Sequence, residues 1–141
     1  MNAARTSTTI TTFSALLLGA GGAAFLFGSD VLLARVIPGT PASATVLGQL
    51  VAAAWLAVAS LNWNQRRVIV GGIYGRPMVL ANLALYLISA FSLARPAMAS
   101  GASPALRLFT VLFGILTVVY GAILLRGPFG ADTAVGATGS S

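Results

Sequence analysis

Four apolar stretches occupy most of this chain, and they decide which class of fold it can adopt. They cover residues 11–33, 44–63, 77–94 and 104–126. The first stretch has about 23 residues, which as a helix would measure about 34 Å, enough to cross the hydrocarbon core of a bilayer. The sequence therefore predicts an all-α integral membrane protein, with four transmembrane helices in an up-down-up-down bundle.

The charged residues are too few for a water-soluble surface. Only 7% of the 141 residues are charged, whereas soluble domains carry about 25%. The chain has no Cys and no His, which excludes disulfides, thiolate and imidazole chemistry, haem ligation by His and ordinary zinc sites. We therefore expect a protein that is not an enzyme and that has no cofactor and no metal.

Turn and capping residues mark the ends of the predicted spans. The Ser/Thr-rich start supplies caps for a helix beginning near Thr11. Pro77 suits the first turn of the third span, and Ser103 followed by Pro104 suits the start of the fourth. We expect the first span to be retained and not cleaved as a signal peptide, since no small-x-small cleavage site follows it. Residues 1–10 and 128–141 are predicted to be a polar tail and a flexible tail.

The arginines predict how the chain is oriented in the membrane. The segment 62–82 contains Arg66, Arg67 and Arg76, and with the N-terminus inside, five arginines face the cytoplasm against three outside. Because positive residues favour the cytoplasmic side, we expect both termini in the cytoplasm and the protein in the plasma (inner) membrane. These three arginines are candidate contacts to anionic lipids, worth about 1 kcal/mol each.

Nucleic acid is excluded as a partner, because the basic residues sit singly or in a pair at span ends and not on one exposed face. The glycines at positions 71, 72 and 75 lie among the arginines of the central loop. They leave two alternatives open, a flexible turn at the headgroups and a backbone nest for an anion.

A polar stripe runs along the third span. Asn82, Tyr86 and Ser89 are spaced at i, i+4 and i+7 and so share one helix face. Asn62 from the second span and Tyr120 from the fourth are candidate neighbours. The stripe is either an interhelical hydrogen-bond network that fixes the register, or the wall of a polar cavity for a small neutral solute or a lipid headgroup. A third reading places the tyrosines at the membrane interface.

Asp30 is the one acidic residue in or near a span. An ionisable residue inside a membrane is a functional candidate by default, here for proton or cation coupling. Asp30 lies near the outer end of its span, however, and Arg107 lies near the start of the fourth span in the same leaflet. We predict an ion pair between Asp30 and Arg107.

Small residues recur at helical spacing. Ala20, Ala24 and Gly28 form an i, i+4, i+8 ridge, Gly48 precedes Ala52 by one turn, and the fourth span contains glycines at 114 and 121. Such residues let helix backbones approach closely in lipid. They indicate either packing within the bundle or an interface between copies, the latter along the first span.

Three functional classes remain after these exclusions. The sequence favours a non-catalytic accessory or scaffold subunit that packs against itself or a partner protein in the membrane. The alternative is a small oligomeric transporter or channel subunit for a small solute, an ion or a lipid. A membrane enzyme is the least favoured class, because no acid/base pair is visible.

Overall fold

The protein is described from a computed structural model, which covers residues 3–67 and 75–126. In these residues the elements are α1 (Ala3–Val36), a short 3-10 helix η1 (Ala42–Ala44), α2 (Thr45–Asn64), α3 (Arg76–Ala97) and α4 (Pro104–Arg126). No strand occurs in the described ranges. The four long helices are long and apolar enough to cross a membrane.

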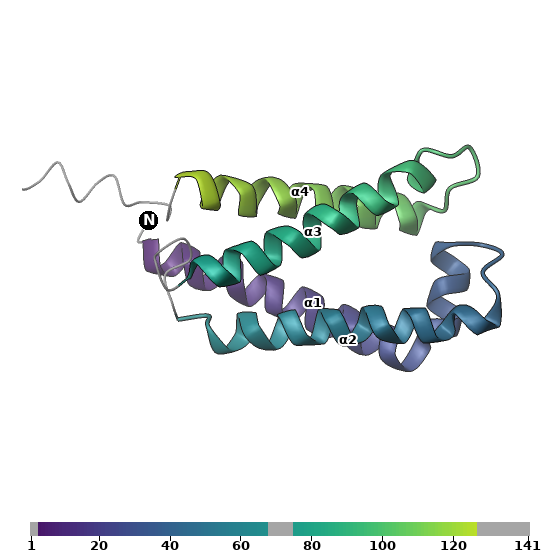
Figure 1. The fold of residues 1–141 in the computed structure, drawn as a ribbon, viewed down its shortest axis with the longest axis horizontal. Helices are drawn as coiled ribbons and strands as arrows, with labels where there is room; N and C mark the ends of the chain where they lie inside the picture. Colours follow the sequence, from purple (N-terminus) through teal and green to yellow (C-terminus); the bar gives the residue numbers. More distant parts are fainter. Residues whose placement is uncertain (1–2, 68–74, 127–141) are drawn as a thin grey trace, which may run out of the picture.

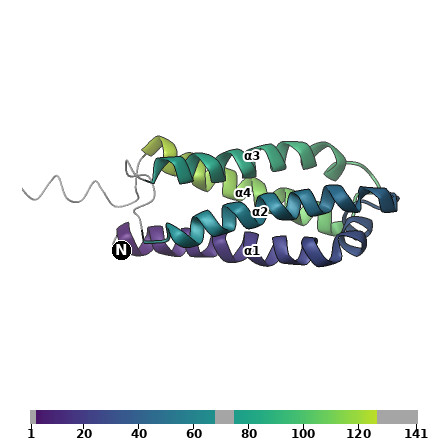
Figure 2. The same cartoon turned by 60° about the horizontal axis from the view of Figure 1, so that its bottom comes forward.

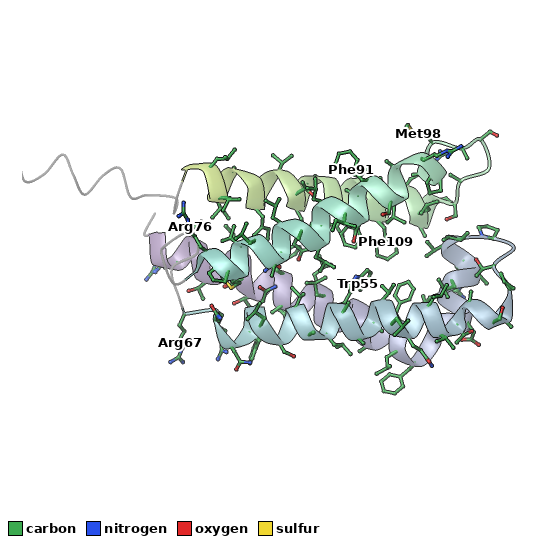
Figure 3. The ribbon with its side chains drawn as sticks, in the orientation of Figure 1. Trp55, Arg67, Arg76, Phe91, Met98 and Phe109 are labelled. Atoms are coloured by element: carbon green, nitrogen blue, oxygen red, sulfur yellow. The ribbon has the colours of Figure 1, made fainter. Side chains whose placement is uncertain are left out.

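The outer surface of the bundle is apolar, as expected for helices that can cross a membrane. Large apolar side chains point away from the bundle on every helix; Phe27 is 87% exposed and Phe91 is 75% exposed, and Figure 3 shows Phe91 directed outward. Soluble monomers rarely expose contiguous apolar surface of this kind. The four apolar helices and their exposed apolar side chains therefore fit a small membrane protein.

Two helical hairpins make up the bundle. α1 lies along α2 and α3 lies along α4 (Figure 1), and the turned view in Figure 2 keeps the same pairs together. The connector between α1 and α2 contains Gly39 with φ 84°, a left-handed conformation that glycine adopts without steric cost. The two hairpins meet along a core of buried side chains that includes Leu18, Trp55, Tyr86 and Tyr120.

Close contact between α1 and α2 depends on glycine. A Cβ atom added at Gly22 would lie 2.8 Å from Leu56 Cγ and 3.2 Å from the carbonyl oxygen of Ala52. A Cβ at Gly48 would lie 2.8 Å from Ser29 Cβ. The small residues at 22, 48 and 52 therefore serve packing within the chain.

Most predicted helix boundaries agree with the observed ones, and α1 differs most. It begins at Ala3, not near Thr11, because the threonine hydroxyls do not cap it. Thr9 donates to the carbonyl of Arg5 and Thr11 to that of Thr8, so both hydroxyls are satisfied inside the helix. Gly28 has non-helical torsions and interrupts α1 near its end.

α3 and α4 begin where prolines predict them. Pro77 lies in the first turn of α3, and Ser103 accepts a hydrogen bond from the amide of Leu106 at 3.2 Å and so caps α4. α3 runs through Pro96 to Ala97, beyond the predicted end at 94. The predicted flexible tail, 128–141, lies outside the described residues.

Candidate functional site

Two asparagines join the hairpins in the interior. The Asn62 amide donates to Asn82 Oδ1 at 2.8 Å, and the Asn82 amide donates to Asn62 Oδ1 at 2.6 Å. Asn82 also donates to the carbonyl of Met78 at 2.9 Å. Both side chains are 0% exposed. This reciprocal pair links α2 to α3 and satisfies polar groups that would be costly to bury alone.

A second polar link joins α1 to α4. The hydroxyls of Ser14 and Tyr120 are 2.8 Å apart and both residues are buried. Tyr86 packs beside Tyr120, with ring centroids 5.5 Å apart. The Tyr86 hydroxyl is buried without a hydrogen-bond partner among the described residues. The tyrosines therefore lie in the core and not at an interface.

The predicted stripe of Asn82, Tyr86 and Ser89 divides between two environments. Asn82 and Tyr86 are packed in the interior with Asn62 and Tyr120. Ser89, about one turn beyond Tyr86 along α3, lines a cleft between the hairpins. Asn82 and Tyr86 thus belong to the packed interior, whereas Ser89 borders a cleft with an almost entirely apolar lining and not the polar cavity that the stripe predicts.

That cleft has a volume of about 270 Å³. All four long helices contribute to its lining, which is apolar except for two serines of α3; the residues are Phe25, Leu33, Val36, Ile37, Val51, Trp55, Ile88, Ser89, Ser92, Leu93, Phe109 and Phe113. Figure 3 shows Trp55 of one hairpin and Phe109 of the other directed into the space between them. The cleft suits an apolar guest.

Aromatic rings form the wall of the cleft. Trp55 contacts Phe25 edge-on at a centroid distance of 5.4 Å and Phe113 at 5.6 Å. Phe113 in turn lies 5.9 Å from Tyr86. Aromatic pairs in these geometries add about 0.5–1.5 kcal/mol each beyond the area they bury. The wall is therefore a connected set of ring contacts that continues into the core around the tyrosines.

Asp30 and Arg107 are not brought together as an ion pair. Both side chains are exposed, one on α1 and one on α4, and within the described ranges neither lies within 4.0 Å of an opposite charge. The acid therefore has no structural partner among the residues seen here.

The basic residues around the central loop occupy one end of the bundle. Arg66 lies over the Trp63 ring at 4.2 Å and donates to the Trp63 carbonyl at 2.6 Å. Arg67 and Arg76 are exposed at the same end, as Figure 3 shows. The glycines at 71 and 72 lie outside the described residues, so the proposed anion nest does too.

The small residues of α1 and α4 lie in different environments. On α1, Ala20 and Ala24 are exposed, while the glycines at 21 and 22 face α2. On α4, a Cβ atom added at Gly114 would meet nothing within 4 Å. An outward groove runs beside it between α3 and α4. Two small-residue surfaces thus remain open on the outside.

Sequence reasoning missed Ser14, Ser92 and the aromatic wall. Ser14 follows Thr11 at i+3, so the pair does place two hydroxyls on one face of the first span. Nothing in the spacing identifies Tyr120 as its partner, because that contact depends on how the hairpins dock. Among the described residues no group of three His, Cys, Asp or Glu side chains could hold a metal ion.

No protein-family model, curated protein or solved structure matches the chain.

Proposed function

We propose that this protein is a non-catalytic accessory or scaffold subunit of the plasma (inner) membrane, which packs against a second copy or another membrane protein. Its four helices form an up-down-up-down bundle across the bilayer, with both termini in the cytoplasm. Arg66, Arg67 and Arg76 contact anionic headgroups on that side.

The closed polar interior carries this proposal. A transport pathway needs polar groups that face water, whereas Asn62 and Asn82 are 0% exposed and use their amides on each other. Groups arranged in this way fix the register between helices. They support a structural role for the interior, which leaves the outer surfaces as the places where function occurs.

The residue inventory supports a role without catalysis. The chain has no His or Cys, and Asp30 is exposed with no ion-pair partner among the described residues. A general acid/base mechanism needs a positioned donor and acceptor within hydrogen-bond reach of a substrate.

Association in the native membrane tests the proposal. The tagged protein is purified in mild detergent, and its mass and composition are measured by light scattering and mass spectrometry. We expect a particle with more than one copy, or one with a second membrane protein in fixed stoichiometry. A monomer without a protein partner would contradict the proposal, and solute flux through liposomes containing the protein would favour the transporter alternative.

Two substitutions then locate the interface. Ala24→Leu fills the exposed surface of α1, and Gly114→Leu fills the open surface of α4. One of them should dissociate the complex. Ala84→Leu, at an exposed position of α3, is the matched control and should leave it intact.

A further inference from the structure

The cleft between the hairpins opens toward the outside of the bundle. Val51 of α2 and Ile88 of α3 both line it and are 42% and 64% exposed. Its opposite wall is buried and consists of aromatic rings, including Trp55, which is 7% exposed. The cleft is therefore a lateral recess with a lipid-facing mouth between α2 and α3, provided that the helices span the bilayer as in the proposed function.

The size and lining restrict what can fill the recess. Apolar cavities of this kind do not retain water, because water needs two to four polar partners. The volume of about 270 Å³ is slightly below the range of about 300–1,000 Å³ for sites that hold drug-sized ligands. One hydrocarbon chain fits such a space better than a bulky solute.

Polar residues at the mouth lead from the recess to the membrane surface. Ile88, Ser92 and Arg95 are spaced at i, i+4 and i+7, so they lie along one side of α3. The Ser92 hydroxyl makes no hydrogen bond to any described residue. Arg95 is exposed in the last turn of α3 and has no ion-pair partner in the described ranges. The Ser92 hydroxyl, a hydrogen-bond donor, and the cationic side chain of Arg95 thus lie between the apolar mouth and the C-terminal end of α3.

A hydrogen bond holds the hairpins together at that end. Ser103 donates to the carbonyl of Val36 at 2.8 Å, and Val36 lines the recess. The Asn62–Asn82 pair joins the hairpins on the other side of the recess. Because hydrogen bonds join the hairpins at both ends of the recess, we expect a ligand to enter laterally from the bilayer.

We propose that this recess binds one acyl chain of an anionic phospholipid, with the lipid phosphate at Arg95. The chain lies against Trp55 and Phe109, the ester carbonyl accepts a hydrogen bond from Ser92, and the guanidinium meets the phosphate. This inference rests on the membrane placement of the proposed function and adds a specific lipid to it.

Trp55 serves as the reporter of occupancy. Trp63→Phe leaves Trp55 as the single tryptophan, since the chain has two. The purified protein in detergent is titrated with phosphatidylglycerol that carries bromine on its acyl chains, because bromine quenches tryptophan fluorescence on contact. We expect quenching that saturates. Brominated phosphatidylcholine should need roughly fivefold more lipid, the factor that corresponds to about 1 kcal/mol for one arginine.

Variants that fill the recess provide the decisive comparison. Ser89→Leu extends into the recess and Ser92→Leu blocks its mouth at an exposed position; both should abolish most of the quenching. Ala57→Leu, at an exposed position of α2 that does not line the recess, should quench like the parent. Quenching that does not saturate, or that persists unchanged in Ser92→Leu, would overturn the proposal.

The headgroup is tested separately. Arg95→Gln should remove the fivefold preference for phosphatidylglycerol, while Arg67→Gln, an exposed arginine at the other end of the bundle, should keep it. Retention of the preference in Arg95→Gln would exclude the assigned phosphate position. Resistance to alkaline extraction from vesicles checks membrane insertion independently. If the protein is inserted but the quenching does not saturate, only the proposed lipid site is wrong. If the protein is extracted, the proposed function is wrong as well.

Discussion

At the scale of single residues, the amide pair of Asn62 and Asn82 is predicted to stabilise the fold. Asn62→Leu leaves the Asn82 amide buried, with the Met78 carbonyl as its only remaining partner in the described part of the chain. A buried polar group that loses its partner costs about 1–3 kcal/mol. We expect destabilisation of that size in a denaturant titration in detergent micelles.

Removing both amides should restore most of the stability that a single substitution loses. Asn62→Leu combined with Asn82→Leu leaves no unpaired amide, so the double variant should be more stable than either single variant. Asn64→Leu is the control, since Asn64 is exposed and, among the described residues, its side chain donates only to the Ser60 carbonyl of its own helix. Equal losses of stability in Asn64→Leu and Asn62→Leu would show that leaving a buried amide unpaired is not the cause of the destabilisation.

Asp30 gives the opposite expectation. The residue is exposed and has no ion-pair partner among the described residues, so Asp30→Asn should change the free energy of unfolding by no more than about 0.5 kcal/mol. The change in the free energy of unfolding caused by Arg107→Gln should add to that of Asp30→Asn in the double variant. Melting curves of the two single variants and the double variant decide the matter, and a loss in Asp30→Asn that Arg107→Gln restores would establish the pair predicted from the sequence.

The helical spacing of Asn82 and Tyr86 was enough to predict that they share a face, because periodicity is a local property of the chain. It could not distinguish Tyr86, which is packed, from Ser89, which lines the cleft. That difference arises because the hairpins touch at one part of α3 and separate at the next. The contact between Ser14 and Tyr120 spans 106 positions, and no local signal encodes it.

At the scale of helices, Gly22 and Gly114 make a matched pair with opposite expectations. Gly22→Ala places a Cβ against Leu56 and the carbonyl oxygen of Ala52, and overpacking of this kind costs about 1–3 kcal/mol. Gly114→Ala meets nothing within 4 Å and should stabilise α4 by about 0.5–1 kcal/mol. Thermal melts in detergent measure both. A stable Gly22→Ala variant would mean that the hairpin tolerates a wider separation than the structure has.

The starts of two helices agree with their signals in the sequence, a proline in the first turn of α3 and a serine hydroxyl that accepts an amide hydrogen bond at the start of α4. Pro77 and Ser103 mark the starts of α3 and α4 as predicted. Thr11 did not mark the start of α1, because a threonine hydroxyl bonds a carbonyl of the preceding turn as readily as it caps. Pro96 stands inside the last turn of α3, so its ring did not end the helix where expected.

At the scale of the whole molecule, the docking of two hairpins creates the features that the sequence did not reveal. Trp55 and Phe109 come from helices far apart in the chain and meet only across the cleft. The span count needed no such information, since length and hydropathy alone predict four helices able to cross a membrane. Their direction across the bilayer rests on the arginine distribution and requires a test of its own.

Cysteine labelling tests that direction, because the wild-type chain contains no cysteine to interfere. Asn64→Cys lies at the end of α2 beside the arginine-rich loop, and Ser100→Cys lies in the connector between α3 and α4; both positions are exposed. With the termini in the cytoplasm, an impermeant maleimide should label Ser100→Cys in intact cells and leave Asn64→Cys unlabelled. Permeabilised cells are the control, in which both should react. Labelling of Asn64→Cys but not Ser100→Cys in intact cells would invert the orientation, and it would place the arginines of the central loop on the outer face against the positive-inside bias.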